Sequence, residues 1–462
     1  MLKLRFILSS LVIFSFLLAS GFGCKGLSTE QKTALRPINL EYWTVYDDVD
    51  AMRELITAYR ATHPQINVQL RQLKAEEFYP RLVEALAEDK GPDIVSINNR
   101  SIQTFLSKLS PMPASVQDTT AYVKKSQLGD ETIVATKQAG MISTLQLDKE
   151  YVQVVKNDAV INGKIYGLPL SVDTMALFYN KDLLDRAGVP EPPKTWEEFQ
   201  EAVRKITKYD KKTGKILQSG AALGAGNNIP GMDDLLFMLF EQSNVDFVSK
   251  SGQAVFHTAP SRMTEETPAM NVMNFYTDFA NSSRDTYTWS EDFGNALDRF
   301  VNGSVAFFFG YSYHYPVVKA RAPQLNFEVL PMLQLNPDKP INVASYWIQG
   351  VTDKSKYKDE SWGLIDFMTH SKNTKTYLDK TGRPTALRAY IGAQQEKIEL
   401  KPFVSQVLIA ENWYRGRNYD TAFKALKDLA RDWLLPAPDP AKILEYRQGL
   451  LNQAASKIGQ TL

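Results

Sequence analysis

INGKIYGLPLSVDTMALFYNKDLLDRAGVPEPPKTWEEF, which runs from Ile161 to Phe199, is the stretch that decides the fold. Asn162-Gly163 predicts a tight turn, because both residues tolerate positive φ. Ile165–Leu170 and Met175–Tyr179 predict two short buried strands, and Asp173 lies between them where the chain changes direction. Helices are expected after the second strand and after the proline-rich loop. This alternation of strands and helices indicates an α/β fold.

The chain from Ile38 onward continues the same alternation. Apolar runs over 38–45, 66–70 and 93–97 predict strands, and helical spacing of apolar residues over 49–62 and 78–87 predicts helices. A strand–helix–strand–helix–strand order implies a parallel sheet with helices on both faces. Because 462 residues exceed what one hydrophobic core usually serves, we expect two lobes.

The first 23 residues have the pattern of an export signal. Lys3 and Arg5 precede the apolar run Phe6–Leu18, which is short for a membrane span. Cys24, the single cysteine of the chain, follows small residues and resembles the lipid-attachment site of bacterial lipoproteins. We therefore expect a signal peptide over 1–23, lipidation of Cys24, and a tether over 24–36 whose polar part, 28–36, is flexible. An ordinary cleaved signal with a stray cysteine is the alternative.

Composition narrows the class of partner. The chain has 44% hydrophobic and 23% charged residues, which are ordinary globular values, and a net charge of +1 gives no reason to expect nucleic acid. A single cysteine excludes an intramolecular disulfide. The four histidines are scattered without the spacing of a zinc motif, so we expect neither a metal nor a cofactor.

The sequence does not favour catalysis. A glycosidase needs two carboxylates about 5–10 Å apart across the scissile bond. The carboxylates available for that role are Asp47, Asp48, Asp173 and Glu291. No nucleophilic triad is indicated, and Cys24 is assigned to the anchor. We therefore expect a binding protein, with a glycosidase as the rival from another class.

The segment 161–199 resembles the signature of the family 1 extracellular solute-binding proteins, the sugar-binding components of bacterial ABC importers. Further segments resemble other elements of that family: YRATHPQINVQL, GPDIVSI, FVNGSVAFFFGYSYH (Phe300–His314), NVASYWIQGV (Asn342–Val351), Gly382-Arg383-Pro384 and NWYRGRN (Asn412–Asn418). The resemblance thus extends from about Leu40 to about Leu429. It implies an exported binding protein, expected to be a monomer, that delivers its ligand to ABC permease subunits in the membrane.

The resemblance also implies the two-lobe periplasmic-binding-protein fold. Crossover segments near Ser171, Leu330 and Ser371 would join two discontinuous lobes. Lobe 1 is then expected to comprise residues 37–171 and 331–371, and lobe 2 residues 172–330 and 372–462. The ligand would bind in the cleft between the lobes, at the carboxyl ends of strands, and lobe closure would bury it.

Aromatic and polar residues gather at segment ends that should face such a cleft. Aromatic rings cover the apolar faces of a sugar, and planar polar groups satisfy its edge hydroxyls. The candidates for ligand binding are Trp43, Tyr46, Asp47, Asn98, Asn99, Asp173, Asn228, Tyr311, Tyr313, Trp347, Trp413, Tyr414 and Arg417, with Arg100 beside the asparagine pair. Asp173 and Trp347 are the candidates that we favour.

Some of these candidates have a structural alternative. Trp43 lies inside an apolar strand and fits a core position, Asp47 and Asp48 could cap the helix that follows, and Asn98-Asn99 could cap the next one. The residues near Asn98 and Asp47 also differ from the pattern of maltose-binding members. A maltodextrin specificity therefore does not follow, and a polyol, a glycerophosphodiester or an amino sugar stays open.

The function expected from these observations is that of a lipoprotein on the outer face of the cytoplasmic membrane, which binds a carbohydrate or related solute for an ABC importer. A surface lipoprotein that keeps the binding fold but senses or adheres is the alternative.

Overall fold

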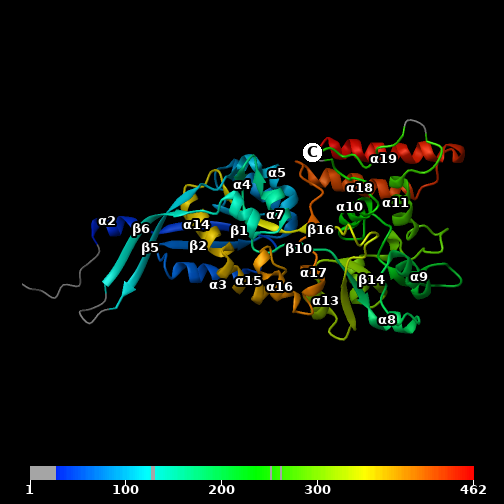
Figure 1. Cartoon of the computed structure of the whole chain (residues 1–462), viewed down its shortest axis with the longest axis horizontal. Coiled ribbons are helices and arrows are strands. Elements are labelled where there is room, and N and C mark those ends of the chain that lie inside the picture. The colour runs from blue at the N-terminus through cyan, green and yellow to red at the C-terminus, as the bar shows by residue number, and fades with distance from the viewer. Residues whose placement is uncertain (1–27, 126–130, 250–251, 261–262) are drawn as a thin grey trace, which may run out of the picture.

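Two hydrophobic cores divide the protein into two lobes that lie end to end along its long axis (Figure 1). The computed structural model describes residues 28–125, 131–249, 252–260 and 263–462. The expected signal peptide and Cys24 lie outside the described residues. The α/β architecture expected from the sequence is confirmed, because each lobe is built on a sheet with helices packed against it.

Lobe 1 contains a sheet of strand order β2-β1-β3-β17-β4, with β9 also paired to β17. β1 runs parallel to β2 and to β3, as the βαβαβ order predicts, and β17 is antiparallel to β3 with Trp347 opposite Asn98. The elements are β1 (Ile38–Thr44), α3 (Val49–Arg60), β2 (Ile66–Gln72), α4 (Ala75–Ala87), β3 (Ile94–Asn98), α5 (Ile102–Phe105), β4 (Leu109–Ser110), α6 (Thr144–Glu150), α7 (Gln153–Ala159), β7 (Val160–Ile161), β8 (Lys164–Ile165), β9 (Leu168–Pro169), β17 (Trp347–Thr352), α14 (Lys358–Thr369), α15 (Ser371–Thr381) and α16 (Ile391–Gln395).

Lobe 2 contains a sheet of strand order β12-β13-β14-β11-β15. β13 and β14 are parallel, whereas β11 is antiparallel to both β14 and β15. The elements are β11 (Ala176–Asn180), α8 (Lys181–Arg186), α9 (Trp196–Ile206), β12 (Lys208–Tyr209), β13 (Ile216–Ala221), α10 (Met232–Gln242), α11 (Pro268–Asp278), α12 (Ala296–Val301), β14 (Val305–Gly310), α13 (His314–Arg321), β15 (Phe327–Pro331), α18 (Tyr419–Trp433) and α19 (Ile443–Gly459).

The stretch that decides the fold behaves largely as expected. Asn162 and Gly163 have positive φ angles of 51° and 74° and form the turn between β7 and β8. The expected strand Ile165–Leu170 is instead divided into β8 and β9. Gly167 lies between them, and a Cβ there would meet the carbonyl oxygen of Gln349 at 2.9 Å, so only glycine lets the chain approach β17 this closely.

Residues 28–36, which we expected to be flexible, contain a helix. α2 (Thr29–Ala34) begins with a capping box, in which the Ser28 side chain accepts from the Gln31 amide and the Gln31 side chain accepts from the Ser28 amide. Two orphan amide groups are satisfied in this way, which favours the helix in a polar sequence.

A long hairpin, which no sequence signal led us to expect, extends from lobe 1 at the end away from lobe 2 (Figure 1). It pairs β5 (Ser115–Lys124) with β6 (Glu131–Gly140) along their whole length. His63 Nε2 lies 2.8 Å from an Asp118 carboxylate oxygen, and the Ala121 amide donates to the Thr62 carbonyl at 2.8 Å. These contacts hold one edge of the hairpin against lobe 1.

Three segments pass between the lobes and form a small sheet of their own. β10 (Asp173–Thr174) is antiparallel to β16 (Asn342–Ser345), and β16 is parallel to β18 (Ala410–Glu411). The short helix α17 (Lys401–Val404) lies beside β10: the Thr174 hydroxyl donates to the Phe403 carbonyl at 2.8 Å. The strands of this crossing sheet are short, and each one links the two hydrophobic cores.

The packing of the cores divides the chain differently from the expected boundaries in its second half. Met332 and Leu333 belong to the core of lobe 2, whereas Tyr377 and Leu387 belong to the core of lobe 1. The reason is that α15 packs against α3. Phe403 then packs into the core of lobe 2, Val404 and Ala410 pack into that of lobe 1, and the chain from Trp413 onward belongs to lobe 2. The first passage lies between Val172 and Met175, and the second between Val343 and Ala344.

Asn342→Ala should lower the free energy of unfolding by about 2–4 kcal/mol, because the side chain satisfies several buried backbone groups of the crossing sheet. Asn342 is fully buried, accepts from the amides of Met175 and Val343, and donates to the Met175 carbonyl and to Gln406. Urea unfolding measures the loss. Asn452→Ala, at an exposed position of α19, is the control. An equal and small effect of both changes would contradict this role.

Candidate functional site

Aromatic side chains of lobe 1 gather where β1 ends and β17 begins. The Trp347 ring lies 5.5 Å from the Tyr46 ring and 6.5 Å from the Tyr79 ring, which is nearly parallel to it. Tyr46 is 54% exposed, so a large part of this aromatic surface is accessible. β17 positions Trp347 because its antiparallel register places it opposite Asn98, at the carboxyl end of β3.

Two tyrosines of lobe 2 follow β14. The rings of Tyr311 and Tyr313 are stacked with centroids 5.8 Å apart and an interplanar angle of 12°. Tyr311 is buried, whereas Tyr313 is 44% exposed. Although the ring is partly exposed, the protein around the Tyr313 hydroxyl group withdraws it from water and raises its pKa, and the charges of Asp173, Tyr46 and Asp234 raise it further. Tyr313 of lobe 2 therefore lies close to Tyr46 of lobe 1 and to the crossing strand β10.

Asp173 is the carboxylate of this site, and it lies on β10 itself. It accepts hydrogen bonds from the Thr174 amide at 2.9 Å, the Ser312 amide at 3.1 Å and the Ser312 hydroxyl at 2.7 Å. Burial raises the pKa of Asp173 to about 6, although the Ser312 hydrogen bonds and the Arg383 charge oppose the rise. The carboxylate is therefore ionised at neutral pH and protonated in mild acid.

Arg383 reaches the same place from lobe 1. It follows α15, whose C-cap Gly382 has a φ of 62° in the left-handed region that favours glycine. Its guanidinium donates to the Tyr46 carbonyl. Burial lowers the pKa of Arg383, but the charges of Tyr377, Asp47 and Asp173 outweigh this effect and raise it. Arg383 and Asp173 thus offer a donor and an acceptor beside the exposed tyrosines.

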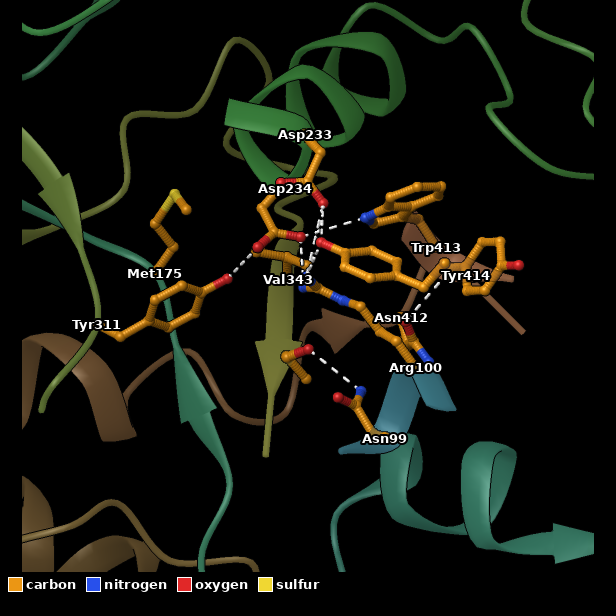
Figure 2. Close-up of polar contacts among 12 residues, drawn as sticks. Asn99, Arg100, Met175, Asp233, Asp234, Tyr311, Val343, Asn412, Trp413 and Tyr414 are labelled. Atoms are coloured by element: carbon orange, nitrogen blue, oxygen red, sulfur yellow. Dashed lines mark hydrogen bonds and ion pairs between the residues drawn. The ribbon is translucent and has the colours of Figure 1, made fainter. Parts of the chain in front are cut away.

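A second, buried cluster joins the lobes near Tyr311 (Figure 2). Arg100, which follows β3 in lobe 1, donates from Nη2 to Asp234 at 2.5 Å, and its Nη1 lies 3.5 Å from Asp233. Both aspartates lie in the first turn of α10 in lobe 2. Tyr311 donates to Asp234 at 2.5 Å, and the Trp413 indole donates to it at 3.2 Å. We call Arg100, Asp233 and Asp234 the interlobe ion cluster.

The sequence around α10 explains why two carboxylates are buried together. The helix begins after Gly231, whose φ is 72°, and continues as Leu-Leu-Phe-Met-Leu-Phe, so nearly all its residues are buried. Burial raises the pKa of Asp233 to about 6, and the neighbouring Asp234 adds to the rise while Arg100 opposes it. Negative side chains are favourable at a helix amino terminus, and Arg100 supplies the counter-charge.

Asp158 joins the crossing segments behind these residues. Its carboxylate accepts from Asn99 at 3.2 Å, Tyr346 at 2.8 Å, Asn412 at 3.2 Å and Arg415 at 2.9 Å. These partners come from the end of β3, the segment before β17 and the segment after β18. A single buried carboxylate therefore fixes the relative positions of three chain segments.

The structure brings together five of the residues that the sequence nominated. Trp347 lies against Tyr46, Tyr311 stacks on Tyr313, and Tyr313 lies near both Tyr46 and Asp173.

The other nominated residues make internal contacts. The Trp43 indole is buried and donates to Glu41, and Asp47 is buried and accepts from Thr44 and Ser96 at 2.7 Å each. Asn98 caps the turn after β3, and Asn99 bonds to Asp158. Asn228 bonds to Trp289 and to three carbonyl groups of lobe 2. The Trp413 indole donates its hydrogen bond to Asp234. Tyr414 is buried, whereas the Arg417 side chain is exposed.

Sequence reasoning missed several residues of the site. Arg383 and Ser312 lay inside segments quoted for the family resemblance but received no role, and Tyr79 was taken only as part of a helix. Asp233 and Asp234 carried the clearest unused signal, since adjacent carboxylates that open an otherwise apolar helix must be buried and therefore paired. Tyr419, which donates to Asp233 at 2.7 Å, carried no comparable signal.

In the residues that the structure describes, no group of three histidine, cysteine, aspartate or glutamate side chains is arranged to hold a metal ion. No helix within the described ranges has the length and apolar character needed to cross a membrane.

Comparisons with known proteins point to one family. A family model described as "Bacterial extracellular solute-binding protein" matches residues 46–375. A putative binding protein of Brucella abortus is 24% identical over 283 residues, which cover 56% of this chain and 62% of that protein. The chain thus spans about three-fifths of the length of this relative. The multiple sugar-binding protein of Streptococcus mutans is 23% identical over 246 residues, covering 52% of this chain and 55% of that protein.

Solved structures show the same fold. A solute-binding protein of an ABC transporter from Thermotoga lettingae, bound to α-D-tagatose, superposes with a TM-score of 0.64 at 18% identity. The match covers 91% of this chain and 99% of that structure. At this identity the similarity confirms the two-lobe fold expected from the sequence.

Ser312→Ala should raise the pKa of Asp173 above about 6, because the hydroxyl donates to the ionised carboxylate and stabilises it. Carbon-detected NMR titration of the Asp173 carboxyl group measures the shift. Ser304→Ala, whose hydroxyl bonds to Asn302 elsewhere in lobe 2, is the control. An unchanged or lowered pKa of Asp173 would show that the hydrogen bond does not act on the carboxylate.

Proposed function

The chain belongs to the bacterial extracellular solute-binding protein family, and on that premise we propose that it binds a carbohydrate between its two lobes. The observation that carries the proposal is the juxtaposition of Trp347 and Tyr46 from lobe 1 with Tyr313 from lobe 2, beside Asp173 and Arg383. Aromatic surface and planar polar groups from both lobes meet at one place.

This set of side chains suits the chemistry of a sugar ring. A pyranose presents apolar C–H faces and a rim of hydroxyl groups. The exposed rings of Tyr46 and Tyr313 and the partly buried Trp347 can cover those faces. The ionised Asp173 carboxylate can accept from hydroxyl groups, and Arg383 can donate to them.

The location of the site explains how binding would be coupled to closure. Trp347 and Tyr46 belong to lobe 1, whereas Tyr313 belongs to lobe 2 and Asp173 lies on a crossing strand. A ligand that contacts both lobes stabilises the arrangement in which they are close together, because only that arrangement offers all the contacts. A permease could then distinguish the closed protein from the open one.

The names of relatives agree with a sugar ligand, since the Streptococcus mutans protein is called a multiple sugar-binding protein and the Thermotoga lettingae structure holds tagatose. We extend the proposal to an exported protein that is held at the membrane by a lipid on Cys24 and acts as a monomer with ABC permease subunits. The signal pattern at residues 1–23 and the position of Cys24 after it support this extension.

A glycosidase role is disfavoured by the bonding of the carboxylates it would need. Asp47 is buried in hydrogen bonds to Thr44 and Ser96. Glu291 accepts from the backbone and side chain of Asn227, in a loop of lobe 2. Asp48 caps α3 and accepts from the Ala51 amide at 2.8 Å. Because the other three carboxylates that the sequence offered are engaged in these contacts, Asp173 lacks a catalytic partner among them, and we propose a binding protein without catalytic activity.

A thermal-shift screen of protein beginning at Lys25 tests the function directly. The panel comprises mono-, di- and oligosaccharides, polyols, amino acids and oligopeptides. A saccharide present at 100 times its dissociation constant should add roughly 2.7 kcal/mol of stability, and its epimers should add less. Stabilisation by peptides alone, or by no compound in the panel, would contradict the carbohydrate assignment.

Trp347→Ala should weaken binding of the stabilising saccharide by tenfold or more, because it removes the central ring of the lobe 1 aromatic surface. Isothermal titration calorimetry measures the affinity. Tyr122→Ala removes an aromatic ring that is 51% exposed on the β5–β6 hairpin, away from the site, and serves as the control. Equal affinities of the Trp347 variant and the unaltered protein would remove Trp347 from the site.

A further inference from the structure

The interlobe ion cluster lies at one end of the proposed site. Arg100 comes two residues after Asn98, the residue opposite Trp347 in the sheet of lobe 1. On the side of lobe 2, Tyr311 stacks on Tyr313 while its hydroxyl donates to Asp234. The cluster is therefore continuous with both aromatic surfaces of the site, and it begins where those surfaces end.

No room is left for a ligand at the cluster itself. Arg100 is 7% exposed, and Asp233 and Asp234 are each 1% exposed. Trp413, 2% exposed, donates its indole N–H to Asp234 (Figure 2). Its ring is surrounded by protein, although an aromatic at this position was expected to contact ligand. The ion cluster thus occupies the space that would otherwise continue the site past Tyr311.

Arg100 is the lobe 1 member of a cluster whose other members belong to lobe 2. Asp233 and Asp234 open α10, Tyr419 opens α18 and accepts from Arg100 Nη1 at 2.9 Å, and Tyr311 follows β14. Separating Arg100 from α10 and α18 would break its side-chain contacts to Asp233, Asp234 and Tyr419. The contacts are made by protein side chains alone, so they form on closure whatever the ligand is.

The interlobe ion cluster has strong charge-assisted contacts, but one of its buried donors lacks a hydrogen-bond partner within the described residues. A buried arginine next to two carboxylates gains charge-assisted hydrogen bonds, and leaving any of these charges unpaired inside the protein is costly. Arg100 Nε is nevertheless buried and has no hydrogen-bond partner within the described residues. An unsatisfied donor weakens the closed arrangement, which suits a contact that must open again.

We propose that the Arg100–Asp234 pair is a latch between the lobes that closes one end of the site and restricts it to short saccharides. The inference rests on the proposed carbohydrate function. The ligand then lies between Trp347 and Tyr313, with Asp173 and Arg383 at its hydroxyl groups. Arg100 and Asp234 act as specificity-determining residues without needing to contact the sugar.

The test compares the unaltered protein with the double variant Arg100→Ala/Asp234→Ala, which removes both charges and opens the space beside Trp413. Affinities are measured for a disaccharide and for a tetrasaccharide of the same sugar. The ratio of tetrasaccharide to disaccharide affinity should rise at least tenfold in the double variant. An unchanged ratio, with both ligands still bound, would overturn the restriction by the latch.

Arg284→Ala/Asp278→Ala is the control. It also removes an arginine–aspartate pair, with an N–O distance of 3.0 Å, but this pair lies within lobe 2 and away from the site. It should leave the ratio unchanged. If the double variant does not fold, Asp234→Ala alone shortens the side chain and leaves Arg100 beside Asp233; a ratio equal to that of the unaltered protein would again contradict the proposal.

Failure of the proposed function is recognised separately. If the unaltered protein binds no saccharide, the carbohydrate assignment fails and the latch is judged by small-angle scattering. Without its latch the double variant should have a larger radius of gyration than the unaltered protein and the control variant. Equal radii would contradict the latch, whatever the ligand is.

Discussion

Three passages of the chain between the lobes place backbone polar groups in buried positions, and the rest of the structure depends on how those groups are satisfied. The crossing sheet β10-β16-β18 pairs part of them. Asn342 and Gln406 supply further partners to Met175, and Asp158 binds four donors from three segments. Buried polar groups without partners are expensive, so the passages are fixed in one arrangement, and that arrangement sets where β14, β17 and β3 end.

The proposed site is a consequence of this geometry. Asp173 lies within the crossing strand β10, and Trp347 begins β17, the strand after β16. Tyr311 and Tyr313 follow β14, and β14 pairs with β11, the strand that comes directly after β10 in the chain. The carboxyl group is partly withdrawn from water, which raises its pKa to about 6, yet Ser312 and Arg383 keep it ionised at neutral pH. The residue that we propose to meet a ligand is thus also part of the crossing sheet, so contact with a ligand would act directly on the relative position of the lobes.

Sequence reasoning found the class of fold because hydrophobic periodicity and the turn at Asn162-Gly163 are local signals. It nominated Asp173, Tyr46, Tyr313 and Trp347 because these residues follow or begin strands, and their ligand contacts stay a prediction. It missed the hairpin β5–β6, whose strands mix polar and apolar residues on both faces and so lack a regular alternation. It assigned α15 to lobe 2, whereas the helix packs into the core of lobe 1, because an amphipathic helix does not reveal which core it covers. Arg100 is more than 130 residues away from Asp233 and Asp234 in the sequence, so their contact can be recognised only in the folded structure.

The crystal structure of the protein with the saccharide that stabilises it most tests the central claim most directly. The account predicts a sugar ring in contact with Trp347, a hydroxyl group within hydrogen-bond distance of the Asp173 carboxylate, and contacts to Tyr313 from the opposite lobe. A saccharide bound elsewhere, for example in the groove of about 380 Å³ lined by Glu241, Lys339 and Glu411 near the crossing sheet, would contradict it.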